Sequence, residues 1–94
     1  MLNIAKMVDI TIESVLEKND IRCCNLYEFL RFSKPIILNE LEEFGFFLKN
    51  QKIFAPASEI VLVWTVEGGE EIRDIYFYWD STATKCSFKI FDVL

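Results

Sequence analysis

The sequence contains no histidine, and among its 94 residues there are only three glycines and two prolines. Without histidine, neither a Ser-His-Asp nor a Cys-His relay can form, which excludes the commonest nucleophilic hydrolases. The pair Gly68-Gly69 is flanked by acidic residues that would repel phosphate, so a glycine-rich phosphate loop is not expected either. We therefore predict that the protein is not an enzyme and that it binds no cofactor.

Cysteine is scarce, and its count is odd, so Cys23, Cys24 and Cys86 cannot all pair within the chain. Three cysteines without histidine also supply too few ligands for a four-coordinate zinc site, and no metal site is predicted. We expect all three to be buried free thiols that behave as small apolar side chains.

Long apolar runs are missing as well. No stretch of about 18 apolar residues is present, so no transmembrane helix and no membrane contact are predicted. The first twenty residues carry Asp9, Glu13 and Glu17, whereas the apolar stretch of a secretory signal is uncharged. We expect a cytoplasmic protein.

Basic residues are the minority charge, 10 against 15 acidic ones, which gives a net charge of −5. Residues 1–54 hold seven Lys/Arg against eight Asp/Glu, a net charge of −1. Residues 55–94 hold three against seven, a net charge of −4. Because nucleic-acid-binding proteins usually have a basic face, this balance disfavours nucleic acid. It favours a protein partner with a basic surface.

Apolar side chains are plentiful, at 52% of residues, which is enough to build the core of one domain over residues 1–94. The predicted fold class is α+β. About three N-terminal helices over residues 1–48 would pack on a three-stranded antiparallel β-meander over residues 60–94. Residues 49–59 are predicted to form a connection, because Pro56 argues against a continuous strand there. Ile53 and Phe54 are expected to return to the core.

The helix boundaries follow from capping signals. Asn25 and Glu28 have the spacing of a capping box, which starts a short second helix. Ser33 is expected to cap a third helix with Pro35 in its first turn, where a missing N–H costs nothing. Gly45 is expected to end that helix in the left-handed conformation.

Residues 60–80 predict a β-hairpin whose two-residue turn is Gly68-Gly69. This turn places Trp64 opposite Arg73. A third strand over residues 86–94 is predicted to pair Trp79 with Cys86 and Arg73 with Asp92, an opposite-charge pair that supports the register.

The predicted pairing leaves both faces of the sheet apolar. The core face, which the helices should cover, comprises Ile60, Leu62, Trp64, Ile75, Phe77, Trp79, Phe88 and Ile90. The second face comprises Val61, Val63, Ile72, Tyr76, Tyr78, Phe91 and Val93, together with Asp74 and Lys89. Either a helix or the N-terminal segment covers the second face, or a partner or a second copy of the chain does.

The function we predict is that of a small acidic protein-binding module acting stoichiometrically, such as an immunity protein or a phage-type inhibitor that occludes its target. The aromatic residues of the second face would be the energetic centre of the contact, and acidic residues would steer a basic partner. The predicted partner-binding residues are Val61, Val63, Ile72, Asp74, Tyr76, Tyr78, Phe91, Glu67, Glu70, Glu71 and Asp80. A homodimeric structural or adaptor protein is an alternative.

Residues 26–53, LYEFLRFSKPIILNELEEFGFFLKNQKI, resemble the helix-turn-helix core of winged-helix proteins. The residues that fall where that pattern expects them are Leu26, Leu30, Ser33, Lys34, Pro35, Leu38, Leu41 and Gly45. The resemblance implies a recognition helix over residues 33–44 and, as the alternative function, a nucleic-acid-binding transcriptional regulator. The nucleic-acid contacts that it implies are Ser33, Lys34, Asn39, Lys49 and Lys52.

Overall fold

The computed structural model describes residues 4–80 and 85–92. Val93, which the sequence places on the second face, lies outside these ranges, and the side chain of Cys23 is likewise outside the description. The helical elements are α1 (Ile4–Lys18), the short 3₁₀ turn η1 (Ile21–Cys23), α2 (Leu26–Glu28), the π-helical turn η2 (Phe29–Ser33) and α3 (Lys34–Glu43). The strands are β1 (Phe47–Phe54), β2 (Ile60–Gly68), β3 (Glu71–Trp79) and β4 (Cys86–Asp92).

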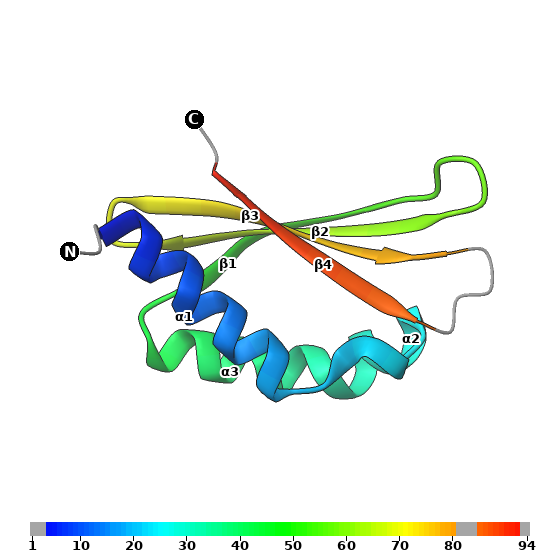
Figure 1. The fold of residues 1–94 in the computed structure, drawn as a ribbon, viewed down its shortest axis with the longest axis horizontal. Coiled ribbons are helices and arrows are strands. Elements are labelled where there is room, and N and C mark those ends of the chain that lie inside the picture. Colours follow the sequence, from blue (N-terminus) through cyan, green and yellow to red (C-terminus); the bar gives the residue numbers. More distant parts are fainter. Residues whose placement is uncertain (1–3, 81–84, 93–94) are drawn as a thin grey trace.

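The strands form one antiparallel sheet in the order β1-β2-β3-β4, and both helices lie on the same side of it (Figure 1). The α+β class is therefore confirmed. The expected numbers of elements are wrong, because two helices replace three and four strands replace three.

The second helix is one unbroken helical run from Leu26 to Glu43. It starts at the predicted capping box: Asn25 Oδ1 accepts from the Glu28 N–H at 2.8 Å, and Glu28 Oε1 accepts from the Asn25 N–H at 3.0 Å. The predicted third helix start at Ser33 is wrong, since Ser33 has helical φ and ψ of −77° and −42° and its side chain caps nothing.

A π-helical turn explains how this helix passes Pro35. Proline lacks an N–H, and its ring crowds the carbonyl four residues earlier. In η2 the Lys34 N–H donates to the Phe29 carbonyl, five residues back, so the helix is wider immediately before the proline. The wider turn lets the helix continue where the sequence predicts a break.

Gly45 ends this helix as predicted, with φ at 86°. The Phe46 N–H donates to the Leu41 carbonyl, and the Gly45 N–H donates to the Glu42 carbonyl, both at 2.9 Å. This pair of bonds is a Schellman motif, which reverses the chain direction. It carries the buried Phe46 ring into the core and delivers the chain to β1.

Strand β1 lies where the sequence predicts the start of a connection, so the connection shrinks to residues 55–59. Its residues have modest strand propensity, but pairing with β2 outweighs that preference. The strand ends before Pro56, and Ala57 takes a positive φ of 52°. Ile53 and Phe54 do not return to the core; they stay half exposed on this edge strand.

The β2–β3 hairpin turns one residue later than predicted, at Gly69-Glu70, and Gly69 supplies the positive φ of 61°. Trp64 therefore pairs with Ile75, and the predicted pairing with Arg73 is wrong by two residues. A shift of two keeps every side chain on its face. The β3–β4 pairing is as predicted, with Trp79 opposite Cys86 and Arg73 opposite Asp92.

The core lies between the helices and the core face of the sheet. Phe29 contributes its ring from η2 and contacts Trp64, Phe77 and Trp79, with ring centroids 5.4, 4.7 and 5.5 Å away. Both indole N–H groups have acceptors: Trp64 donates to Gln51 at 2.9 Å and Trp79 to the Cys24 carbonyl at 2.7 Å. Within the described ranges, no helix is long and apolar enough to span a membrane.

Candidate partner-binding face

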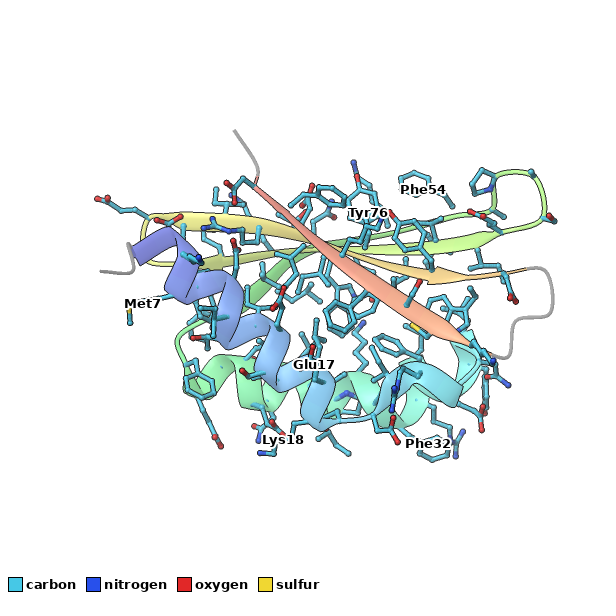
Figure 2. The ribbon with its side chains drawn as sticks, in the orientation of Figure 1. Met7, Glu17, Lys18, Phe32, Phe54 and Tyr76 are labelled. Carbon is cyan, nitrogen blue, oxygen red and sulfur yellow. The ribbon has the colours of Figure 1, made fainter. Side chains whose placement is uncertain are left out.

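The second face of the sheet lies on the side opposite the helices (Figure 1). The side chains of Tyr76 and Phe54 project from it away from α1 and α3 (Figure 2). The open question of what covers this face is thus answered for residues 4–80 and 85–92: neither helix does. Strand β1 extends the second face by four residues, placed by their pairing with β2: Phe47, Asn50, Lys52 and Phe54.

An aromatic cluster occupies the middle of the second face. The Tyr76 ring stacks on Tyr78 with centroids 6.1 Å apart and meets Phe91 edge-on at 5.1 Å. Val61 and Val63, which pair with Tyr78 and Tyr76 on the neighbouring strand, are only 7% and 6% exposed. Of the predicted contact residues on this face, the aromatic side chains are therefore more accessible to a partner than the two buried valines beside them.

Tyr78 keeps its phenolic proton across the neutral range. Partial burial, followed by the nearby Tyr76 and Glu59, raises the pKa of Tyr78 above its ordinary value. The hydroxyl is therefore a hydrogen-bond donor as well as an acceptor at neutral pH. A half-buried ring with such a polar tip suits a protein interface.

The predicted steering acids do not gather into one patch. Asp74 lies on the second face, where its Oδ1 accepts from the Thr65 hydroxyl at 2.6 Å. Glu67 also lies there and pairs with Lys49 at 3.5 Å. Glu70 is in the hairpin turn, and Glu71 is beside Arg73 on the core face. The remaining one, Asp80, follows β3 at the opposite end of the sheet.

Two lysines flank the aromatic cluster, one on each edge of the sheet. Cross-strand pairing runs directly from Lys52 to Val63, from Val63 to Tyr76 and from Tyr76 to Lys89. Both lysines are exposed, and in the described part of the chain neither side chain makes a hydrogen bond or ion pair. The sequence does not predict this arrangement, because the arrangement requires β1, whose residues are predicted to form a connection.

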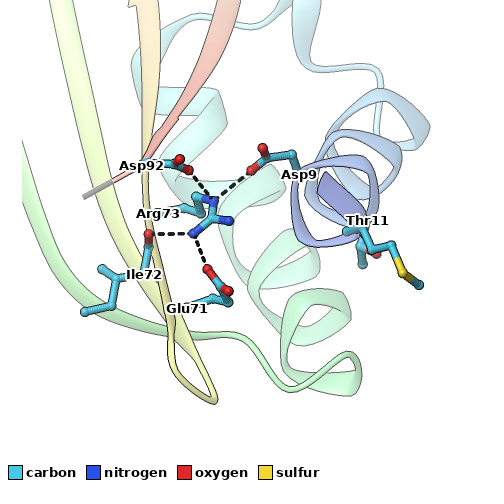
Figure 3. Close-up of polar contacts among 7 residues, drawn as sticks. Asp9, Thr11, Glu71, Ile72, Arg73 and Asp92 are labelled. Atoms are coloured by element: carbon cyan, nitrogen blue, oxygen red, sulfur yellow. Dashed lines mark hydrogen bonds and ion pairs between the residues drawn. The ribbon is translucent and has the colours of Figure 1, made fainter. Parts of the chain in front are cut away.

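Arg73 is the one charged side chain among the buried residues described, at 3% exposed. Its guanidinium contacts Asp9 from α1 and Glu71 from β3 at 2.8 Å, and Asp92 from β4 at 2.9 Å (Figure 3). Burial lowers the pKa of Arg73, but the hydrogen bonds to Asp9 and Glu71 and the surrounding carboxylates outweigh it, so the pKa is raised. This cluster ties α1 to two strands, which is a structural role.

The residues implied by the winged-helix resemblance are spread over the long helix and β1. No turn separates two helices over residues 26–43, so the helix-turn-helix is absent. Lys34 is half-buried and donates to Gln51 Oε1 at 2.8 Å, while Lys49 pairs with Glu67. Asn39 is exposed on α3, and Ser33 is half-buried inside the long helix. Lys52 instead belongs to the second face.

The two cysteines whose side chains are described, Cys24 and Cys86, lie near η1. Cys86 is buried as predicted, and burial, followed by the nearby Cys24, raises its pKa to about 12. Cys24 is only half-buried and donates to the Ile21 carbonyl. A cleft of about 590 Å³ opens beside Cys86, with a rim of mixed charge that includes Asp20, Glu59 and Lys85. Nowhere in the described residues do three His, Cys, Asp or Glu side chains gather to hold a metal ion.

Comparison with known proteins gives no relative. Searches of protein families, of curated proteins and of solved structures find no match to this chain.

Proposed function

We propose that the protein is a small cytoplasmic protein-binding module that acts stoichiometrically and not as a catalyst. It would occlude a surface of its target, as an immunity protein or an enzyme inhibitor does. One observation carries the proposal: the second face holds an aromatic cluster that neither helix covers. Contiguous apolar patches on a small protein usually mark an interaction site.

The composition of the second face supports a protein partner. Tyrosine is enriched at the centres of protein interfaces, because its ring buries apolar area while its hydroxyl keeps a polar contact. Tyr76 and Tyr78 have both properties, and their rings are already held against each other. Both also stand on β3, a central strand of the sheet, so little conformational freedom is lost when a partner binds.

The binding energy should be concentrated in these two tyrosines. We expect Tyr76→Ala and Tyr78→Ala each to weaken binding by about 2 kcal/mol or more, as hot-spot residues do. The basic partner predicted from composition loses its support, because Glu71 pairs with Arg73 and Asp80 lies at the far end of the sheet. The proposal therefore depends on the aromatic cluster and not on acidic steering.

The test is a pull-down from source-cell lysate with three baits: the wild-type chain, Tyr76→Asp, and Tyr27→Asp as a matched control. Tyr27 is 65% exposed, but it lies on the long helix, away from the second face. We expect one protein in 1:1 ratio by native mass spectrometry, retained after nuclease treatment. It should be lost with Tyr76→Asp and kept with Tyr27→Asp, while both variants unfold at temperatures close to that of the wild type.

Two outcomes would contradict the proposal. Retention of the partner by Tyr76→Asp would move the site away from the second face. Capture that nuclease abolishes would instead support a nucleic-acid-binding regulator. The homodimer alternative is checked by light scattering of the purified chain, because a mass that doubles with concentration and falls with Tyr76→Asp would assign the second face to self-association.

A further inference from the structure

We propose that the second face receives an amphipathic α-helix whose apolar stripe is flanked on both sides by acidic residues. This inference rests on the proposed function and names the chemistry of the partner. Three observations carry it: the positions of Lys52 and Lys89, the engagement of the acids on the same face, and the dimensions of the surface between the two lysines.

Lys52 and Lys89 stand at the two ends of one row of paired residues that crosses all four strands. Three interstrand spacings of about 4.8 Å separate their backbones, which makes about 14 Å. Val63 and Tyr76 lie between them in that row. The row is thus apolar in its middle and positively charged at both ends.

The acids of the second face do not neutralise these two lysines. Asp74 is engaged by the Thr65 hydroxyl at 2.6 Å, and Glu67 is paired with Lys49 at 3.5 Å. Lys52 and Lys89 have no such partners within the ranges that the structure describes. Asp74 keeps its negative charge, because a hydroxyl donor does not neutralise a carboxylate, but it lies outside the row that joins the two lysines. Both charges within that row are therefore positive, although the chain as a whole carries −5.

A helix fits this surface in both width and length. An α-helix with its side chains is about 10–12 Å across, so it can lie lengthwise between two lysines about 14 Å apart. The face runs from Val61 to Glu67 along β2, about 20 Å, which matches roughly 13 helical residues. A helix there would complete a three-layer arrangement in which the sheet is covered on both faces.

Lysines on edge strands can also serve a purely protective role, because they discourage edge-to-edge pairing of sheets. That explanation needs a charge at the edge but not a particular sign. Replacing both lysines by glutamate keeps the edges charged and reverses only the preference for a partner. The double variant Lys52→Glu/Lys89→Glu therefore separates the two explanations.

The experiment is a display selection on the immobilised full-length chain. The library presents 14-residue amphipathic helices with a fixed apolar stripe and flanking positions that vary among Glu, Gln and Lys. Wild type, Lys52→Glu/Lys89→Glu and Tyr76→Asp serve as baits, and sequencing gives the enrichment at each flank. A 12-nucleotide oligo(dT) is titrated against the same proteins by fluorescence anisotropy.

We expect wild type to enrich Glu over Lys at the flanks by about tenfold, and the double variant to reverse that preference. Equal enrichment of both charges, lost with Tyr76→Asp, would overturn the acidic-helix assignment and leave the proposed function standing. Enrichment that is no greater on wild type than on Tyr76→Asp would count against both. Oligo(dT) binding tighter than that of the best helix, weakened by the double variant, would assign the lysines to single-stranded nucleic acid.

Discussion

Both faces of the sheet carry large apolar side chains, but their surroundings differ. On the core face, Trp64, Phe77 and Trp79 are fully buried beneath the helices. On the second face, Phe54 and Phe91 are 47% and 44% exposed, although they stand on strands of the same sheet. Alternation along a strand assigns residues to faces, but it does not say which face is covered. Only the path of the helices decides that.

The polar groups on the two faces differ in the same way. On the core face the buried polar side chains are hydrogen-bonded or ion-paired, and Arg73, for example, contacts three carboxylates. Among the described residues no buried side-chain nitrogen or oxygen lacks a hydrogen bond. On the second face the side chains of Lys52 and Lys89 have no hydrogen-bond or ion-pair partner within the described residues. A surface that keeps charges and aromatic rings available is suited to binding rather than to stability.

The largest expected effect comes from removing a residue that the core face depends on. Phe29→Ala should lower the free energy of unfolding by about 4 kcal/mol, because it leaves a cavity among three aromatic rings. Phe32→Ala, three residues along the same helix and 59% exposed, should cost less than about 0.5 kcal/mol. Urea denaturation of both variants measures the difference. Equal losses would mean that η2 does not orient Phe29 inward.

A somewhat smaller loss is expected from Arg73→Met. The variant keeps an unbranched side chain but leaves Asp9, Glu71 and Asp92 close together without a cation. We expect a loss of about 3 kcal/mol, at the lower end for a broken buried ion pair, because the three carboxylates remain partly exposed. Salt at 1 M should recover part of it by screening their repulsion.

The control for Arg73→Met is Asp92→Asn, which removes the most exposed of the three carboxylates. It should cost no more than about 1 kcal/mol, as exposed ion pairs do. Arg73→Met with a loss below that of Asp92→Asn in the same urea titration would show that the cluster does not hold α1 to the sheet.

An intermediate effect is expected at the hairpin end of the sheet, where Gly68 touches the Schellman motif. A Cβ on Gly68 would clash with the Phe46 ring and lie 2.9 Å from the Gly45 carbonyl oxygen. Gly68→Ala should therefore cost about 2 kcal/mol by overpacking. Gly69→Ala meets nothing within 4 Å and should cost only about 1 kcal/mol for its φ of 61°. The reverse order in thermal unfolding would show that Phe46 moves aside freely.

The sequence predicts which residues share a face of the sheet better than it predicts where the helices and strands begin and end. Every described residue that the sequence assigns to a face of the sheet lies on that face. The predicted hairpin register is wrong by two residues, but an even shift leaves each side chain on the same face. The Asn25 cap and the Gly45 stop were also predictable, since both are local. The unbroken helix past Pro35 was not, because it depends on a π-helical turn that no local pattern signals.

The candidate site was only half predictable for a related reason. Tyr76, Tyr78 and Phe91 stand on strands with clear β-propensity, so their shared face followed from alternation. Strand β1 forms because β2 offers it a partner, which is a long-range cause that its own residues do not reveal. Lys52 was consequently assigned to the winged-helix resemblance, and its position opposite Lys89 across the sheet could not be foreseen.

The smallest expected effect on stability is on the second face, and the experiment tests directly whether that face is the exposed apolar surface of the protein. The double variant Phe54→Ser/Phe91→Ser removes two aromatic side chains that are already about half exposed, so unfolding should become easier by only about 1 kcal/mol in total. Binding of an apolar fluorescent dye such as ANS should nevertheless fall, because Phe91 belongs to the aromatic cluster and Phe54 stands on the same face. Phe44→Ser is the control, since Phe44 is 61% exposed at the end of α3 and lies off the sheet. It should leave dye binding unchanged. A dye signal that persists in the double variant and disappears with Phe44→Ser would show that the exposed apolar surface lies on the helices and not on the sheet.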